Sequence, residues 1–588
     1  MNAKLKEFAP LIPAKYFIFI ILFCSIIYNF LLSASFKSPL LRAVLNNHPI
    51  SSFLLFFIFC SVFFGFVVCL REKGSSLSRS LVIFLPIILL FFWPAAETNV
   101  SLLIPFLIVI ATQAIFYKVL FCEKGLFTGS DPSKEKIALT AIIILYLLFF
   151  SYFSIRIFND FAVFNPKDFG LFNQIFWNSI RGRFFLNSTY GSHFACHNSL
   201  FFVLLMPFYY FLPDPLTLLV LKTTVLALSA VPFYLIVKDI LKQTSSLALV
   251  AAFLFLPFIA VQNFTPAHEM GFAPLFILFT YYFFRKERFL PFLVFLLITV
   301  SIKETMALLA LMFGFYAYFK KRGSVWIIYP ILIGITWFFF SIVLINHFQN
   351  LYHPHSDSAW YFVYVKKAFL AHNKSGPVAT IAYLFTNSNL AHWFTLKSAI
   401  SLFFSLGLAP SLLSPVILLG LPELSVNLIS SNPNMFYPVW HYSITLFCFI
   451  LIGVAEGIKT IASFLCDKKF LEISEQKLQS LLCVSVLSCA LISSYIWIEF
   501  TEHKRDAVYV REVKEALSLV PVNASISVPL RIVTIVSSRE KYSIAGPHPS
   551  DDYILVDREA MQKELKTDID PNYSEIFRRG PIVLYKRK

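Results

Sequence analysis

Long apolar runs recur along most of this chain, and they limit its fold more than any other feature. Runs of roughly 20 residues, the length at which a helix crosses a bilayer, follow one another from Tyr16 to Ile498. Hydrophobic residues make up 58% of the sequence, charged residues only 14%, and the mean hydropathy is +0.72. Lipid offers the backbone no hydrogen-bonding partners, so these runs must be helices. The sequence predicts an all-α polytopic membrane protein.

The formal net charge of +16 is placed in a way that indicates topology. A strongly basic chain can bind nucleic acid, but most of this excess lies in short loops between apolar runs. That distribution follows the positive-inside rule and excludes a nucleic-acid partner. It places the amino terminus inside, predicts about 15 spans, and puts the loops 158–198 and 347–397 outside. The short run 199–212 ends at Pro213 and is expected to lie along the outer surface.

The character of the chain changes after Thr501, where charged residues become frequent. Strand-like runs occur at Ile532–Val536, Tyr553–Val556 and Ile582–Tyr585, and Val508–Leu519 has the pattern of an amphipathic helix. We therefore expect a small soluble α/β domain outside the membrane.

The first predicted external loop contains a helix pattern that begins at Asp168 and ends at Ile180. Apolar residues share one face of this pattern, and Gln174 and Trp177 lie on the other, as in a helix lying in the lipid headgroups. Asp168 at its start has two interpretations. It caps the helix, where a carboxylate suits the helix dipole, or it is a general base beside the membrane. Asp160 is a weaker candidate for the same role.

Other ionisable residues lie near predicted outer ends of spans, where they are functional candidates by default. His193 and His197 are spaced to share one helix face, so they could ligate a metal or bind a phosphate or hydroxyl group. Lys303 and Glu304 form a structural ion pair, or Lys303 binds an anionic group such as a lipid-linked phosphate. The remaining candidates of this kind are Arg156, His268, Glu269 and His441.

Several segments resemble a known family when taken in order. They are D-F-G-L-F-N-Q-I-F-W-N-S-I-R-G, H-F-A-C-H-N-S-L, F-T-P-A-H-E-M-G-F-A-P, K-E-T-M-A-L and L-P-E-L-S-V-N-L-I-S-S-N. Together they resemble the prokaryotic membrane proteins of "domain of unknown function 2079", a family similar to the GT-C superfamily of membrane glycosyltransferases. The resemblance runs from about Ala138 to the carboxy terminus. It leaves 1–137 as an added block of about four spans, 138–499 as a GT-C-like transmembrane domain and 500–588 as the external domain.

The resemblance implies a function and a site. GT-C enzymes take a sugar from a polyprenyl-phosphate donor, and Asp168 matches the acidic residue of their first external loop. Asp168 would then be the catalytic base, with a cationic residue holding the leaving phosphate. The paired acidic motif of that superfamily is absent, which leaves activity and the use of a divalent metal open. The candidate substrate-binding residues remain those given by their position in the predicted topology: Arg156, Asp160, Gln174, Trp177, His193, His197, His268, Glu269, Lys303, Glu304 and His441. The implied location is a prokaryotic cytoplasmic membrane, with membrane lipid as a partner.

Two other functions are compatible with a polytopic chain. A transporter or flippase for a lipid or small solute should carry polar groups at mid-span and inverted repeats. Here the ionisable residues gather at span ends instead, which favours the glycosyltransferase. A non-catalytic scaffold that presents the carboxy-terminal domain is the third possibility. No nucleotide-binding P-loop motif occurs, so ATP-driven transport has no support.

Overall fold

The computed structural model describes residue 111 and residues 132–241, 243–354, 407–430, 432–435, 440–468, 473–501, 507–544, 550–558 and 570–588. The spans predicted before residue 132, and with them nearly all of the added block 1–137, lie outside the described residues. Most of the predicted loop 347–397 does too.

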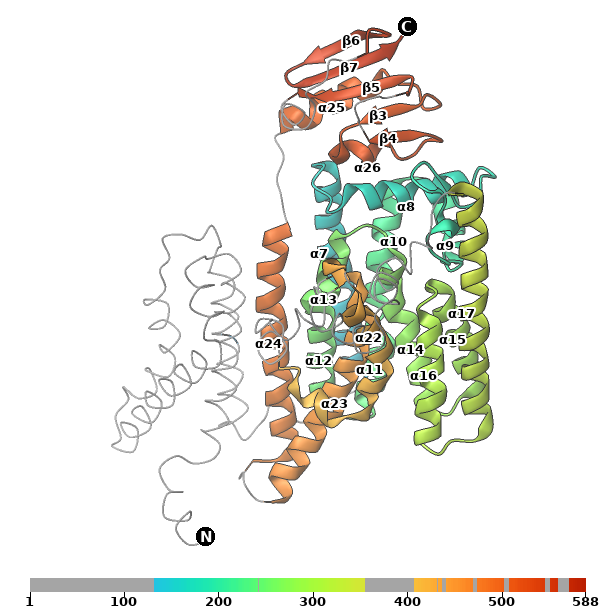
Figure 1. The fold of residues 1–588 in the computed structure, drawn as a ribbon. Coiled ribbons are helices and arrows are strands. Elements are labelled where there is room, and N and C mark those ends of the chain that lie inside the picture. Colours follow the sequence, from blue (N-terminus) through green and yellow to red (C-terminus); the bar gives the residue numbers. More distant parts are fainter. Residues whose placement is uncertain are drawn as a thin grey trace, which may run out of the picture.

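The described part is mostly helical, with five helices long and apolar enough to cross a membrane, or six if one bent pair counts as a span. They stand side by side as a bundle (Figure 1). They are α7 (Pro132–Asn159), α10 with α11 (Pro215–Leu228, Ala230–Lys238), α17 (Ser324–Tyr352), α23 (Ile444–Asp467) and α24 (Glu475–Thr501), and the bent pair covers Ser245–Phe255 and Pro257–Phe264. The total of about 15 spans stays a prediction.

Shorter helices complete the bundle. Between α11 and α17 lie α12 (Gln243–Phe255), α13 (Pro257–Ala260), α14 (Ala273–Arg285), α15 (Phe289–Ile302) and α16 (Met306–Phe319). The run 199–212 forms only the ten-residue helix α9 (Phe202–Phe211), which is too short to cross. Prolines divide the segment before α23 into two 3-10 helices, η5 (Ala409–Leu413) and η6 (Pro415–Gly420), and α22 (Leu421–Ile429).

Within 507–588, the described residues form a five-stranded sheet with the two α-helices α25 and α26. The strand order is β4-β3-β5-β7-β6, in which β3 pairs in parallel with β4 and β5, while β7 pairs antiparallel with β5 and β6. The elements are α25 (Ala507–Ser518), β3 (Ile526–Val528), α26 (Val533–Val536), β4 (Tyr542–Ile544), β5 (Tyr553–Asp557), β6 (Tyr573–Arg579) and β7 (Ile582–Arg587). The expected helix and the two later strands are present.

The strand expected at Ile532–Val536 is wrong, because Val533–Val536 form the short helix α26. A run of five apolar residues does not by itself distinguish a buried strand from a buried helix. This run packs against α8 (Pro166–Ser179) instead of pairing with the sheet, so contact with another part of the chain decides its conformation.

Helix α8 runs across the end of the bundle, directly beneath the carboxy-terminal sheet (Figure 1). The expectation that its polar face lies in lipid headgroups is wrong. All residues from Phe169 to Asn178 are buried, because residues 533–542 cover that face. The helix therefore lies between the bundle and the sheet.

Candidate functional site

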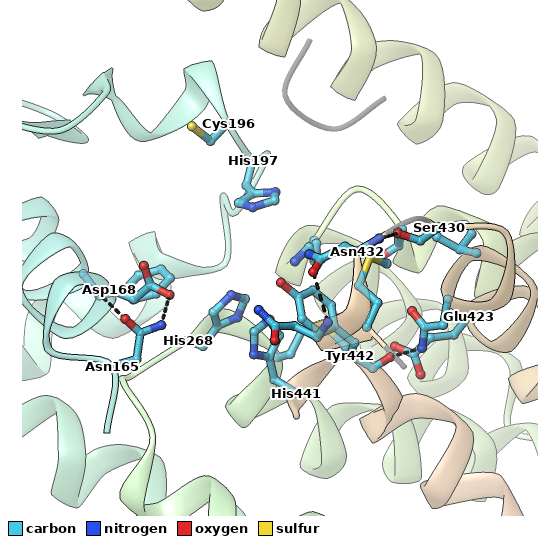
Figure 2. Close-up of a pocket in the computed structure, with 18 of the residues that line it drawn as sticks. Asn165, Asp168, Cys196, His197, His268, Glu423, Ser430, Asn432, His441 and Tyr442 are labelled. Atoms are coloured by element: carbon cyan, nitrogen blue, oxygen red, sulfur yellow. Dashed lines mark hydrogen bonds between the residues drawn. The ribbon is translucent and has the colours of Figure 1, made fainter. Parts of the chain in front are cut away.

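A cavity of about 490 Å³ lies at the α8 end of the bundle. Its walls come from the first turn of α8, the turn at 193–197, the junction between α15 and α16, and the segment from α22 to Tyr442. Figure 2 shows Asp168 with Asn165 on one side of this space and Glu423, Ser430 and Asn432 on the other, with His268 and His441 between them. Six of the predicted site residues line this one cavity: Asp168, His193, His197, His268, Lys303 and His441.

Asp168 is held at the start of α8 by Asn165. The backbone of Asn165 has a left-handed conformation (φ 53°), and its side-chain oxygen accepts a hydrogen bond from the amide of Asp168. Its side-chain amide donates to the Asp168 carboxylate in return. The helix cap is therefore Asn165, and the interpretation of Asp168 as the cap is wrong. The Asp168 carboxylate faces the cavity from the first turn, where the helix dipole stabilises an anion, and it makes no ion pair with any described residue.

Lys303 lies where the chain leaves α15 in an extended conformation, and its ammonium is buried beside the cavity. Its Nζ atom is 3.0 Å from Oε1 of Glu269, and Oε2 of Glu269 is 3.0 Å from Nδ1 of His268. Burial opposes the charged form of Lys303, but Glu269 and Glu304 raise its pKa overall. The buried lysine therefore stays charged because carboxylates surround it.

Glu304 has a different partner. Its Oε1 atom is 3.1 Å from Nδ1 of His197, and its Oε2 atom accepts the backbone N–H of Asn198 at 2.9 Å. Burial would raise the pKa of Glu304, but His197 and Lys303 lower it to about 2. The direct ion pair expected between Lys303 and Glu304 is thus replaced by two pairs, Lys303 with Glu269 and His197 with Glu304. Because the backbone is extended at Lys303, the side chains of Lys303 and Glu304 point in different directions. Lys303 therefore meets Glu269, and Glu304 meets His197.

The four candidate histidines lie near one another. The rings of His268 and His441 stack with centroids 3.6 Å apart, and those of His193 and His197 are 5.9 Å apart. His193 begins a 3-10 turn rather than an α-helix, so it and His197 do not share a helix face. Within the described segments, no group of three or more His, Cys, Asp or Glu residues is arranged to hold a metal.

Comparison with known proteins identifies the family. The profile of the family described as "Predicted membrane protein (DUF2079)" matches residues 163–575. The chain belongs to this family. The match includes every residue that lines the cavity, and it begins later and ends earlier than the resemblance suggested.

Two further comparisons bear on the DUF2079 chain. No curated protein sequence matches it at a significant level. Its structure aligns with the crystal structure of ArnT from Cupriavidus metallidurans in the apo state, with a TM-score of 0.44 and 10% identity. The alignment covers 78% of this chain and 98% of that one. Its score is too low to support an argument.

Several predicted residues lie away from the cavity. Arg156 and Asp160 contact each other at 3.9 Å, outside the cavity wall. Gln174 bonds to the carboxy-terminal domain, and the Trp177 ring lies 4.0 Å from the Arg181 guanidinium. Glu269 and Glu304 lie behind the wall, as partners of Lys303 and His197.

Sequence reasoning missed the amide and hydroxyl groups of the opposite wall. These groups belong to Asn427, Ser430, Asn432, Asn434 and Tyr442, and the carboxylate of Glu423, which the sequence places with His441 at a predicted outer turn, lies in the same wall. Glu423 accepts hydrogen bonds from Oγ1 of Thr445 and the amide of Leu446, both at 3.0 Å, and so joins α22 to the start of α23. The motif L-P-E-L-S-V-N-L-I-S-S-N contains four of these residues, and it is the sequence feature from which this wall could have been predicted.

Proposed function

We propose that this chain is a membrane glycosyltransferase that takes a sugar from a polyprenyl-phosphate donor and transfers it to an acceptor at the extracytoplasmic face. One observation carries the proposal. The Asp168 carboxylate has no cationic partner among the described residues, and it shares the cavity with the buried ammonium of Lys303. Four imidazoles line the same cavity, those of His193, His197, His268 and His441. Glycosyl transfer from a phosphate needs these two kinds of group, a base for the acceptor and positive charge for the leaving group.

The residues suit the bond changes. Asp168 would take the proton from the acceptor hydroxyl as its oxygen bonds to the anomeric carbon of the sugar. The bond between that carbon and the phosphate oxygen breaks, and its electron pair leaves with the phosphate. An ammonium has three N–H donors, and the ion pair with Glu269 occupies one of those of Lys303. His441, whose Nε2 atom has no hydrogen-bond partner within the described segments, would contact the same leaving group.

The test compares variants of the full chain in a strain deleted for the gene. Surface glycans and pools of lipid-linked sugar are measured after complementation. Asp168→Asn keeps the size of the side chain but removes the base, so we expect transfer to fall by about 10²–10⁴-fold. The matched control is Asp239→Asn, which removes a carboxylate paired with Lys286 at 2.6 Å just after α11.

The outcomes separate the functions. Full rescue by Asp168→Asn would remove Asp168 as the base. Movement of a labelled lipid across the membrane without turnover of any sugar donor would instead support the transporter.

A further inference from the structure

Helix α8 has 14 residues, and other parts of the chain cover it on two sides. On one side Phe172 and Phe176 pack against Phe202 of α9, with ring centroids 5.8 and 5.1 Å apart. On the other side lie α26 and the residues that follow it (Figure 1). Helices of about 12–15 residues are marginally stable in water on their own. The conformation of α8 therefore depends on the surfaces that cover it.

Hydrogen bonds from two buried side chains join α8 to the carboxy-terminal domain. The side-chain amide of Asn173 donates to the hydroxyls of Ser537 and Ser538, both at 3.0 Å. That of Gln174 donates to the carbonyl oxygens of Arg539 and Glu540, at 3.1 and 2.8 Å. These bonds require one orientation of the domain on the helix, which a loosely tethered domain would not show.

The two parts also approach closely at Gly170, two residues after Asp168. A Cβ atom at this position would overlap Cγ1 of Val533 and would lie 3.0 Å from the Tyr542 hydroxyl. Glycine is the residue that lets another backbone or side chain approach this closely. In the chain just after α8, Arg183 forms an ion pair with Glu540 at 3.0 Å, and Ser188 accepts the amide of Tyr542 at 3.2 Å.

We propose that the carboxy-terminal domain supports the cavity although none of its described residues lines it: docked on α8, it holds Asp168 in place. Gly170, Asn173 and Gln174 are then positioning residues that act through Asp168 without touching substrate. The role assigned to Asp168 rests on the proposed function, whereas the docking on α8 does not. An independent acceptor-binding module would leave α8 unchanged when the contact is weakened.

The test is a rescue in the full-length protein, purified in detergent or nanodiscs. Gly170→Ala forces Val533 away from α8, and Gly170→Ala with Val533→Ala removes the atom it would overlap. We expect faster amide exchange in residues 166–179 for the single variant and a return to wild-type exchange for the double variant. Gly323→Ala, whose Cβ would meet no atom within 4 Å, is the matched control and should exchange like wild type.

Activity provides the second measurement. Displacement of a reacting group by about 1 Å can lower a rate by about 10²-fold, so kcat should fall by that order in Gly170→Ala. KM for the acceptor should change little, and the second substitution should restore kcat. If Gly170→Ala does not fold, Gln174→Ala tests the same contact by removing the bonds to Arg539 and Glu540.

Each outcome has a definite meaning. Wild-type exchange of α8 in both Gly170→Ala and Gln174→Ala would overturn the proposal. So would faster exchange in Gly170→Ala with kcat unchanged. If the exchange results follow expectation but the wild-type protein transfers no sugar, the docking stands and the proposed function fails.

Discussion

His193 is an imidazole in apolar surroundings at the edge of the cavity. Its side chain is buried, with the rings of Phe172, Phe185 and Phe202 at centroid distances of 5.8, 6.1 and 5.7 Å. Neither ring nitrogen has a hydrogen-bond partner among the described residues. Burial lowers its pKa to about 3. His193 is therefore neutral at physiological pH, and its nitrogens are available to a ligand in the cavity.

This environment predicts a dependence of stability on pH. In the unfolded chain His193 binds a proton below its ordinary pKa of 6.5, whereas in the folded chain it does so only near pH 3. The free energy of unfolding therefore falls by about 1.4 kcal/mol for each unit by which the pH drops below 6.5. The His193→Phe variant has no imidazole to protonate, so its free energy of unfolding should rise relative to that of wild type as the pH is lowered from 7 to 5. Unfolding curves at pH 7, 6 and 5 measure the difference, and a constant offset would contradict the prediction.

At the scale of elements, close backbone contact decides how helices cross. Helix α23 passes η5 at Gly457, where a Cβ atom would overlap the carbonyl group of Pro410. One turn earlier, a Cβ at Gly453 would lie 3.0 Å from that of Ser411. Small residues four apart let helices in membranes pack this closely. The position of η5, and of α22 after it, depends on these glycines.

Gly457→Ala tests that packing. The atom that a methyl group would meet belongs to the backbone, which cannot rotate away as a flexible side chain can. We expect a loss of about 1–3 kcal/mol, the usual cost of overpacking, measured as a lower midpoint of thermal unfolding in detergent. Gly323→Ala serves as the reference substitution, and equal midpoints for the two variants would refute the close contact.

At the scale of the whole molecule, the cavity and the carboxy-terminal sheet lie at one end of the bundle. The loop between α16 and α17, with Lys320, Lys321 and Arg322, lies at the opposite end (Figure 1). Basic loops stay on the cytoplasmic side. The two observations together predict that the cavity lies on the outer face.

Protease access checks this orientation in intact spheroplasts. An epitope after Lys588 should be digested, whereas one inserted between Lys321 and Arg322 should be protected until the cells are lysed. The reverse pattern would put the cavity inside and would argue against a donor presented at the outer face.

The sequence by itself determined the features that depend on local pattern. Apolar run length predicted the membrane helices and the shortness of α9 (Phe202–Phe211), and periodicity predicted α25, β5 and β7. Ordered motifs predicted the family. Ionisable residues near predicted outer ends of spans supplied the site candidates, among them Asp168, His197, His268 and Lys303; their chemical roles stay predictions.

Only the tertiary structure decided which distant segments meet. His197 and Glu304 are 107 residues apart, and Gln174 and Glu540 are 366 apart. No local pattern specifies such a pair, because it exists only once the helices between the two residues have packed. For the same reason α26 became a helix, α8 was covered by the sheet domain, and Glu423 came to lie across the cavity from Asp168.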